Sequence, residues 1–172
     1  MEAIAVIFID YSVRKLDLLA GRIEACFDRL TNEQIWARGS AHENAIGNLV
    51  LHLCGNVRQW IVSGVGGASD TRDRDAEFAA QAGASISDLE RRLRDTVAEA
   101  VTVLRDLPVA RLVERVTIQK YEVSVLEAIY HVVEHFSMHT GQIVFAAKML
   151  TGSDLGFYNH LRSNAAHEEK TP

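Results

Sequence analysis

Four long stretches of this sequence repeat their apolar residues at intervals of three and four positions, which is the spacing of one face of an α-helix. They cover approximately residues 3–30, 44–63, 85–106 and 125–150. A helix of about 20 residues with one apolar face is stable when that face packs against other helices. The sequence therefore predicts an all-α fold, in which four helices form a bundle around one core.

Short motifs mark where these helices begin and end. The capping-box spacing, a serine followed three positions later by a glutamate, precedes or opens the second, third and fourth helix: Ser40–Glu43, Ser87–Glu90 and Ser124–Glu127. Asn44 is an alternative cap for the second helix. Pro108 ends the third helix and Gly152 ends the fourth, since proline cannot continue a helix and glycine favours its C-terminal cap.

Two connections differ from the short turns of a simple bundle. Residues 64–84 are polar, and a link of this length predicts one long crossover loop, with a helical turn around Glu77–Gln81. Residues 112–123 alternate apolar and polar side chains, which indicates a short extended arm or small hairpin before the last helix. We expect residues 1–162 to form one domain, the bundle, and residues 163–172 to form a flexible polar tail.

Composition and charge argue against several classes of function. The net charge is −5 and no face gathers Lys and Arg, so binding to a nucleic-acid backbone is not expected. The apolar run Ala3–Ile9 is too short for a membrane span and lacks the flanks of a signal peptide. Cys26 and Cys54 form no Cys-x-x-Cys pair, which suits a reducing compartment. We expect a cytoplasmic protein that binds neither nucleic acid nor membrane.

Three of the seven histidines lie on one stripe of the fourth helix. His131, His135 and His139 are spaced by four, and each step of four residues rotates by only about 40° around the helix. Two imidazoles one turn apart can bind the same metal ion, but the first and the last of these are about 12 Å apart along the axis. The ligand pair is therefore either His131 with His135 or His135 with His139.

His52 is the candidate for a third ligand, on another helix. It lies within the apolar second helix, and Asn48 and Asn56, each about one turn away, continue a polar strip along it. Cys54 lies about 200° round the same helix and cannot join the site. Buried imidazoles need polar partners, and a shared metal ion supplies them. The alternative is a metal-free bundle in which these side chains form a hydrogen-bonded core network.

Two segments resemble the DinB/YfiT-like superfamily of metal-binding four-helix bundles. Residues 44–60, NAIGNLVLHLCGNVRQW, are similar to its second-helix signature. Residues 131–143, HVVEHFSMHTGQI, are similar to its last-helix signature, in which a histidine, three residues and a second histidine precede a glycine and a glutamine. Residues 74–78 and 154–158 fit an uncharacterised branch of the superfamily, so the resemblance covers nearly the whole chain.

The resemblance implies a DinB-like bundle, often a homodimer, with three histidines that bind one divalent metal ion (nickel, zinc or iron). Carried over by position, the metal ligands are His52, His135 and His139. Side chains in a second layer could orient the ligands or a bound water. The candidates for that supporting layer are His131, Gln142, Asn48 and Asn56.

Three neutral imidazoles leave coordination positions open, as catalytic metal sites do. We therefore expect a metal-dependent enzyme. The resemblance indicates a thiol transferase, and the open metal site also fits a hydrolase. Its partners would be a small-molecule substrate or a low-molecular-weight thiol. The alternative is a non-catalytic, metal-binding stress or scaffold dimer. Three imidazoles also suit copper, so the sequence leaves both the native metal and the substrate open.

Overall fold

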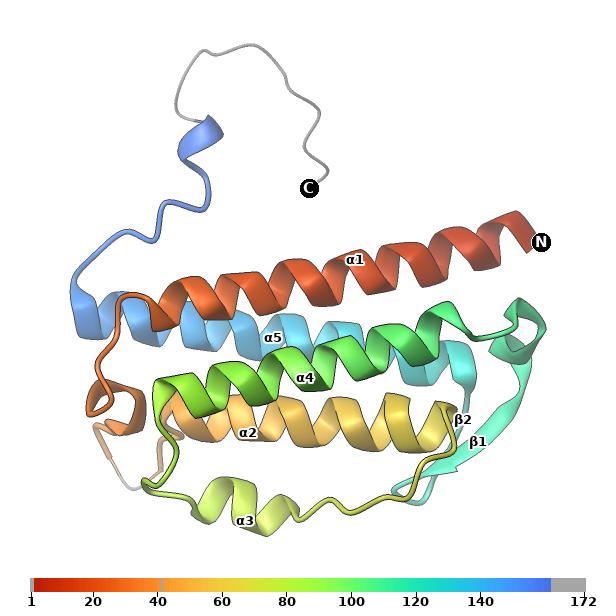
Figure 1. Ribbon diagram of the computed structural model, residues 1–172, viewed down its shortest axis with the longest axis horizontal. Coiled ribbons are helices and arrows are strands. Elements are labelled where there is room, and N and C mark those ends of the chain that lie inside the picture. Colours follow the sequence, from red (N-terminus) through yellow and green to blue (C-terminus); the bar gives the residue numbers. More distant parts are fainter. Residues whose placement is uncertain (1, 41, 162–172) are drawn as a thin grey trace.

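The computed structural model describes residues 2–40 and 42–161. Four long helices form the bundle (Figure 1): α1 Glu2–Phe27, α2 Ile46–Val57, α4 Ile86–Arg105 and α5 Val125–Thr151. A π-helical segment, Arg58–Val65, continues α2 without a break. The predicted all-α bundle is thereby confirmed.

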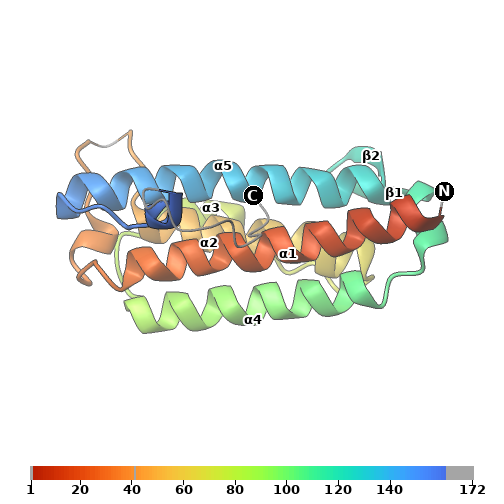
Figure 2. The same cartoon turned by 90° about the horizontal axis from the view of Figure 1, so that it is seen from above.

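Each of the four long helices packs against two others. α1 contacts α4 and α5, and α2 contacts the same two helices. α1 and α5 run in one direction along the bundle, whereas α2 and α4 run in the other (Figures 1 and 2). Because α2 and α4 are parallel, the chain must return along the bundle between them, which requires the predicted long crossover.

The crossover contains a short helix of its own, α3 Arg74–Ala79, which packs against α2 (Figure 1). Asp73 caps this helix, since its carboxylate accepts a hydrogen bond from the backbone N–H of Ala76 at 3.0 Å. The helical turn predicted around Glu77–Gln81 was therefore placed too late in the chain. An acidic cap just before Arg74 decides where the helix begins.

The extended arm before α5 is a β-hairpin. β1 Arg115–Ile118 pairs antiparallel with β2 Tyr121–Ser124. Gln119 and Lys120 form the turn with φ of 52° and 74°, as a two-residue type I′ turn requires. The hairpin contacts the π-helical continuation of α2, so it covers the end of the bundle where that helix finishes.

One predicted cap of the later helices is wrong and one is confirmed. Ser85, and not Ser87, caps α4: its hydroxyl accepts from the backbone N–H of Asp88 at 3.2 Å, and the Asp88 carboxylate accepts from the Ser85 N–H at 3.2 Å. Aspartate takes the place that the capping box gives to glutamate, which is why the pattern indicated a later serine. Ser124 caps α5 with Glu127 in the reciprocal position, as predicted.

The second helix begins later than predicted and has no serine cap. Its first turn follows Ala45, whose backbone N–H donates to Oδ1 of Asn48 at 3.1 Å. The hydroxyl of Ser40 and the carboxylate of Glu43 bond to each other at 3.2 Å in the preceding loop. Asn48 therefore contributes to the start of α2.

Within residues 2–40 and 42–161, no helix is both long enough and apolar enough to cross a membrane. The flexible tail predicted at residues 163–172 lies outside the described residues. The cytoplasmic location stays a prediction.

Candidate metal centre

Imidazoles from two helices meet in the seam between α2 and α5. Nε2 of His52 lies 3.0 Å from Nε2 of His135, and the ring centre of His139 lies 5.1 Å from that of His52 and 4.5 Å from that of His135. One nitrogen from each ring lies within 4.8 Å of the others, so the three side chains, here called the histidine group, could hold one metal ion. His52 is buried and the other two are half-buried, so the group is more open on the α5 side.

His131 lies on the same stripe of α5 but outside the histidine group. Its ring stacks on that of His135, with centroids 5.5 Å apart and planes at 26°, and its centroid lies 4.2 Å from that of the Trp60 indole. Because His52 lies next to both His135 and His139, the geometry favours this pair over the alternative of His131 with His135. His131 packs as an aromatic side chain one turn away.

The second nitrogen of His52 contacts an acidic side chain of the crossover. Oε2 of Glu77 on α3 lies 3.0 Å from Nδ1 of His52, and both side chains are buried. Arg72 donates from Nε to Oε1 of Glu77 at 2.8 Å and from Nη2 to Oε2 at 2.9 Å. Nη2 of Arg72 also lies 3.1 Å from Nδ1. A carboxylate has no proton to give, so Nδ1 of His52 donates to Glu77, and the lone pair of Nε2 faces His135.

Gly55 lets this charged pair approach α2 closely. A Cβ atom at that position would lie 1.8 Å from Oε1 of Glu77 and 2.9 Å from Nε of Arg72. A glycine inside a helix lowers its stability, so it is usually found where something must come close to the backbone. Here the group that comes close is the carboxylate that orients His52.

The surroundings favour the neutral form of His135 and His139 and the charged form of Glu77. Burial, together with the neighbouring imidazoles, lowers the pKa of His135 to about 3. Burial also lowers the pKa of His139. Burial acts to raise the pKa of Glu77, but hydrogen bonds from Arg72 and His52 outweigh it, and the pKa is lowered. Neutral imidazoles with available lone pairs are the form that binds metal ions.

The four predicted supporting residues have different surroundings. Gln142 contacts the histidine group, with Oε1 at 2.7 Å from Nδ1 of His139. His131 stacks on the group, as described above. Asn48 instead donates from Nδ2 to the backbone oxygen of Glu77 at 2.9 Å, which ties the crossover to α2. Asn56 is buried, and its Oδ1 has no hydrogen-bond partner among the described residues.

This donor set fits a divalent metal ion. Two nitrogens bound to one ion at about 2.0–2.1 Å are about 3 Å apart, and the two Nε2 atoms of His52 and His135 lie 3.0 Å apart. A carboxylate behind a ligating histidine is the usual outer partner in metal sites, and Glu77 stands in that position. Imidazole nitrogens suit zinc, nickel, copper and iron.

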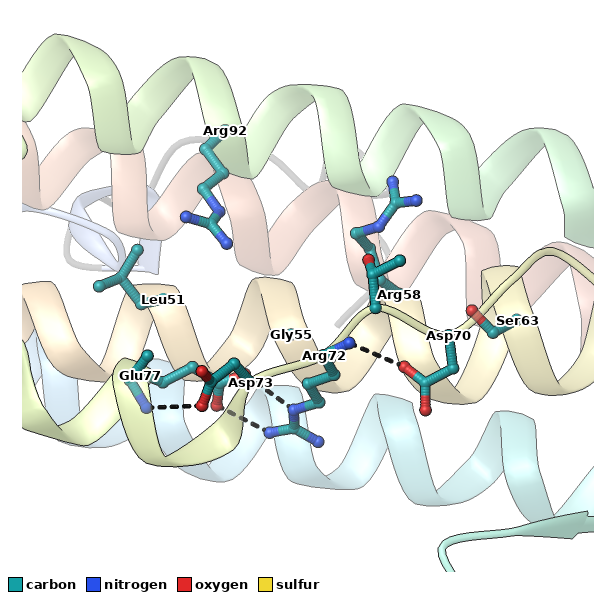
Figure 3. Close-up of a pocket in the computed structure, with 11 residues that line it drawn as sticks. Leu51, Gly55, Arg58, Ser63, Asp70, Arg72, Asp73, Glu77 and Arg92 are labelled. Atoms are coloured by element: carbon teal, nitrogen blue, oxygen red, sulfur yellow. Dashed lines mark hydrogen bonds and ion pairs between the residues drawn. The ribbon is translucent and has the colours of Figure 1, made fainter.

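A cavity of about 290 Å³ lies beside the Arg72–Glu77 pair, between α2, α4 and the crossover (Figure 3). The guanidinium groups of Arg58 and Arg92 also line it, and Arg58 forms an ion pair with Glu99 of α4. Its lining includes no member of the histidine group. The cavity therefore reaches the charged pair that supports His52, and not the imidazoles themselves.

Comparison with known protein families finds one family model that matches this chain. A family model described as "Protein of unknown function (DUF1572)" matches residues 3–160, which include all four long helices and the histidine group. The chain belongs to this family. The description does not name the DinB/YfiT-like superfamily, so that resemblance stays a prediction.

The fold of this DUF1572 protein also occurs in a solved structure. The "Crystal structure of the conserved protein of locus from Enterococcus faecalis" aligns with a TM-score of 0.73 and covers 84% of this chain and 97% of that chain. The two sequences are 17% identical, so the likeness shows the fold alone. No curated protein matches this chain.

Sequence reasoning missed the two residues that hold His52 in this DUF1572 protein. Glu77 and Arg72 lie 25 and 20 positions from His52 along the chain, and no helical repeat connects them to it. The signal that could have indicated a contact is Gly55, because an interior helical glycine often marks a close approach. That signal does not say which residue comes close.

Proposed function

We propose that this protein binds one divalent metal ion through His52, His135 and His139 and uses it to activate a small-molecule nucleophile. The observation that supports this most is the meeting of three imidazoles, one from α2 and two from α5, around one point. The lowered pKa values of His135 and His139 keep those imidazoles in the metal-binding form. Three protein ligands leave room on the ion for a further ligand.

Each protein group has its own part in this site. A divalent ion held here supplies Lewis acidity, which lowers the pKa of a bound water or thiol. Glu77 accepts a hydrogen bond from Nδ1–H of His52, which fixes the tautomer and would make Nε2 a stronger donor to the metal. Gln142 does the same for His139 through Oε1. The buried side of the group excludes water, and the half-buried α5 side admits the substrate.

The reaction that we propose is thiol transfer or hydrolysis on a small-molecule substrate. Both reactions need a nucleophile that is deprotonated near neutral pH, and a metal site with an open position provides one. The thiol reaction is supported by the resemblance to the DinB/YfiT-like superfamily, in which low-molecular-weight thiols act as substrates. Zinc, nickel and iron all suit the donor set, so the ion has to be identified by measurement.

Protein purified without a histidine tag tests the proposal. Elemental analysis is expected to find one divalent ion per chain, and the loaded protein is expected to turn over pairs of a thiol and an electrophile, or activated esters. His135→Ala should lose both the ion and the turnover, whereas His42→Ala, an exposed histidine outside the group, should keep both. Turnover that is unchanged in His135→Ala would rule out catalysis at this site. Wild-type protein that binds no divalent metal would rule out the site itself.

A second candidate is a metal-binding stress or scaffold dimer without catalysis. It is favoured by the position of the histidine group, which would link α2 to α5 through the ion and so stabilise the bundle. A ligand that binds only the folded state raises its stability by mass action. If this candidate is right, a chelator lowers the Tm of the wild type but not that of His135→Ala. Neither protein then turns over a substrate pair.

A further inference from the structure

An apolar groove begins beside the histidine group and follows α5 toward its C-terminal end. It has a volume of about 650 Å³ and lies between α5, the start of α2 and the segment before α2. Ile46 and Leu49 are buried on its α2 side, and Phe145 and Met149 of α5 stay 68% and 72% exposed beside it. A concave site of several hundred Å³ with mostly apolar lining is typical of small-molecule binding.

Gln142 belongs to both the groove and the histidine group. It lines the groove, and its Oε1 accepts a hydrogen bond from Nδ1 of His139 at 2.7 Å. With Oε1 turned to His139, the Nε2 amide group remains as a donor and makes no hydrogen bond within the described residues. The inner end of the groove is therefore polar and adjoins the imidazoles, whereas the rest is apolar.

The charged side chains of the groove are already engaged within the chain. Arg38 donates to Oδ1 of Asn48 and to the backbone oxygen of Ala80, both at 2.7 Å. Glu43 accepts from the backbone N–H of Gly39 at 2.7 Å. Because these groups have partners, the groove suits an uncharged tail better than a charged one.

We propose that the groove binds the tail of the substrate, an amphiphile with an alkyl or acyl chain whose polar head lies at the histidine group. This inference rests on the proposed function, since the metal-binding head determines which end of the substrate lies inward. From Gln142 to Met149 the helix rises by about 10 Å. An extended alkyl chain with bonds of about 1.5 Å zigzags and advances about 1.3 Å per bond, so about nine carbon atoms have that length.

Alkyl hydroxamates of increasing chain length test the inference, because the hydroxamate head binds divalent metals while the tail varies. In cobalt-loaded protein, the visible absorption of the metal reports binding of the head. Affinity is expected to rise about two- to fourfold with each added methylene, as apolar burial predicts, and to level off beyond about nine carbons. Phe145→Ala should flatten this rise and leave the affinity for acetohydroxamate unchanged. Tyr158→Ala is the control, since it removes an aromatic side chain that is 57% exposed and lies outside the groove.

Two outcomes would overturn the inference directly. One is equal affinity for short and long hydroxamates in the wild type, and the other is a chain-length dependence that Phe145→Ala leaves unchanged. If Phe145→Ala also converts a dimer into a monomer in sedimentation velocity while the dependence stays, the groove is covered by a second copy of the chain. That result too would contradict a substrate tail at this place.

A measurement that needs no metal distinguishes a wrong groove assignment from a wrong metal-site assignment. In His135→Ala labelled with ¹³C-methyl methionine, octanol is expected to shift the methyl resonance of Met149. The resonance of Met138, which is 49% exposed and lies outside the groove, should not move. If hydroxamates fail to bind but octanol shifts Met149, the groove assignment holds and the proposed function fails. If octanol shifts neither methionine, the groove assignment itself is wrong.

Discussion

Glu77 acts directly on the histidine group, because its hydrogen bond with Nδ1 of His52 leaves Nε2 to face the metal position. Glu77→Gln keeps the shape of the side chain but removes its charge. Metal affinity is expected to fall by about 10- to 100-fold, as for outer partners of ligating histidines, in a competition titration against a coloured chelator. Glu99→Gln is the control, since that glutamate pairs with Arg58 away from the imidazoles. Equal affinities for the two variants would contradict the role given to Glu77.

The two cysteines are predicted to be unreactive in the folded protein. Burial raises the pKa of Cys26 to about 11 and that of Cys54 to about 11, so both stay protonated at pH 8. The thiolate is the reactive form, and reactivity should therefore increase only as the pH rises toward these values. Ellman's reagent at pH 8 is expected to modify both thiols slowly in native protein and rapidly in guanidinium chloride. One thiol that reacts at once in the native state would show that a cysteine is available for chemistry.

The elements differ in how far the sequence could predict them. The last helix was predictable at both ends, because the Ser124 cap and the left-handed Gly152 at φ 63° are local signals. The start of α4 agrees with the predicted range, but its cap was assigned to Ser87 because Glu90 completes the usual motif, whereas Asp88 fills the same place for Ser85. The contact of Glu77 with His52 could not be predicted, since it depends on the path of the crossover between two parallel helices.

Gly55 is expected to control how closely the crossover packs on α2. Gly55→Ala would place a Cβ atom 1.8 Å from Oε1 of Glu77, so the carboxylate and Arg72 must move away. We expect the free energy of unfolding to fall by about 1–3 kcal/mol, as for other overpacked sites, and the amides of residues 70–80 to exchange faster with deuterium.

Gly141→Ala is the matched comparison for Gly55→Ala. A Cβ atom at this second helical glycine meets nothing within 4 Å. Its replacement by alanine should therefore stabilise α5 by about 0.5–1 kcal/mol. Crossover amides that exchange at the wild-type rate in Gly55→Ala would show that the glycine is not needed for the approach of Glu77.

The directions of the four long helices determine which segments of the chain meet at the histidine group. Because α2 and α4 are parallel, the chain between them passes along the bundle beside α2 (Figure 1). This passage carries Glu77 and Arg72, which both contact Nδ1 of His52. A bundle with alternating helices and short turns would have the same four apolar faces but no crossover beside α2. The topology therefore supplies the carboxylate as well as the two helices that carry the imidazoles.

The predicted homodimer has a candidate surface on α1. Ile4 and Ile7 are 72% and 64% exposed, and farther along the helix Tyr11 and Leu18 line a surface hollow with Tyr130 of α5. Extended apolar areas of this kind are typical of contacts between subunits. Ile7→Glu would place a charge that has no partner in such an interface, so it is expected to shift the protein from dimer to monomer in sedimentation velocity.

Leu161→Glu is the control for the dimer prediction, because Leu161 is 72% exposed, like Ile4, but lies outside α1 and α5. It adds the same charge and should leave the sedimentation coefficient of the wild type unchanged. A wild type that sediments as a monomer at micromolar concentration would contradict the dimer itself. A dimer that persists in Ile7→Glu would place the interface elsewhere, and Phe145→Ala, measured in the same way, then shows whether the groove beside the histidine group is that interface.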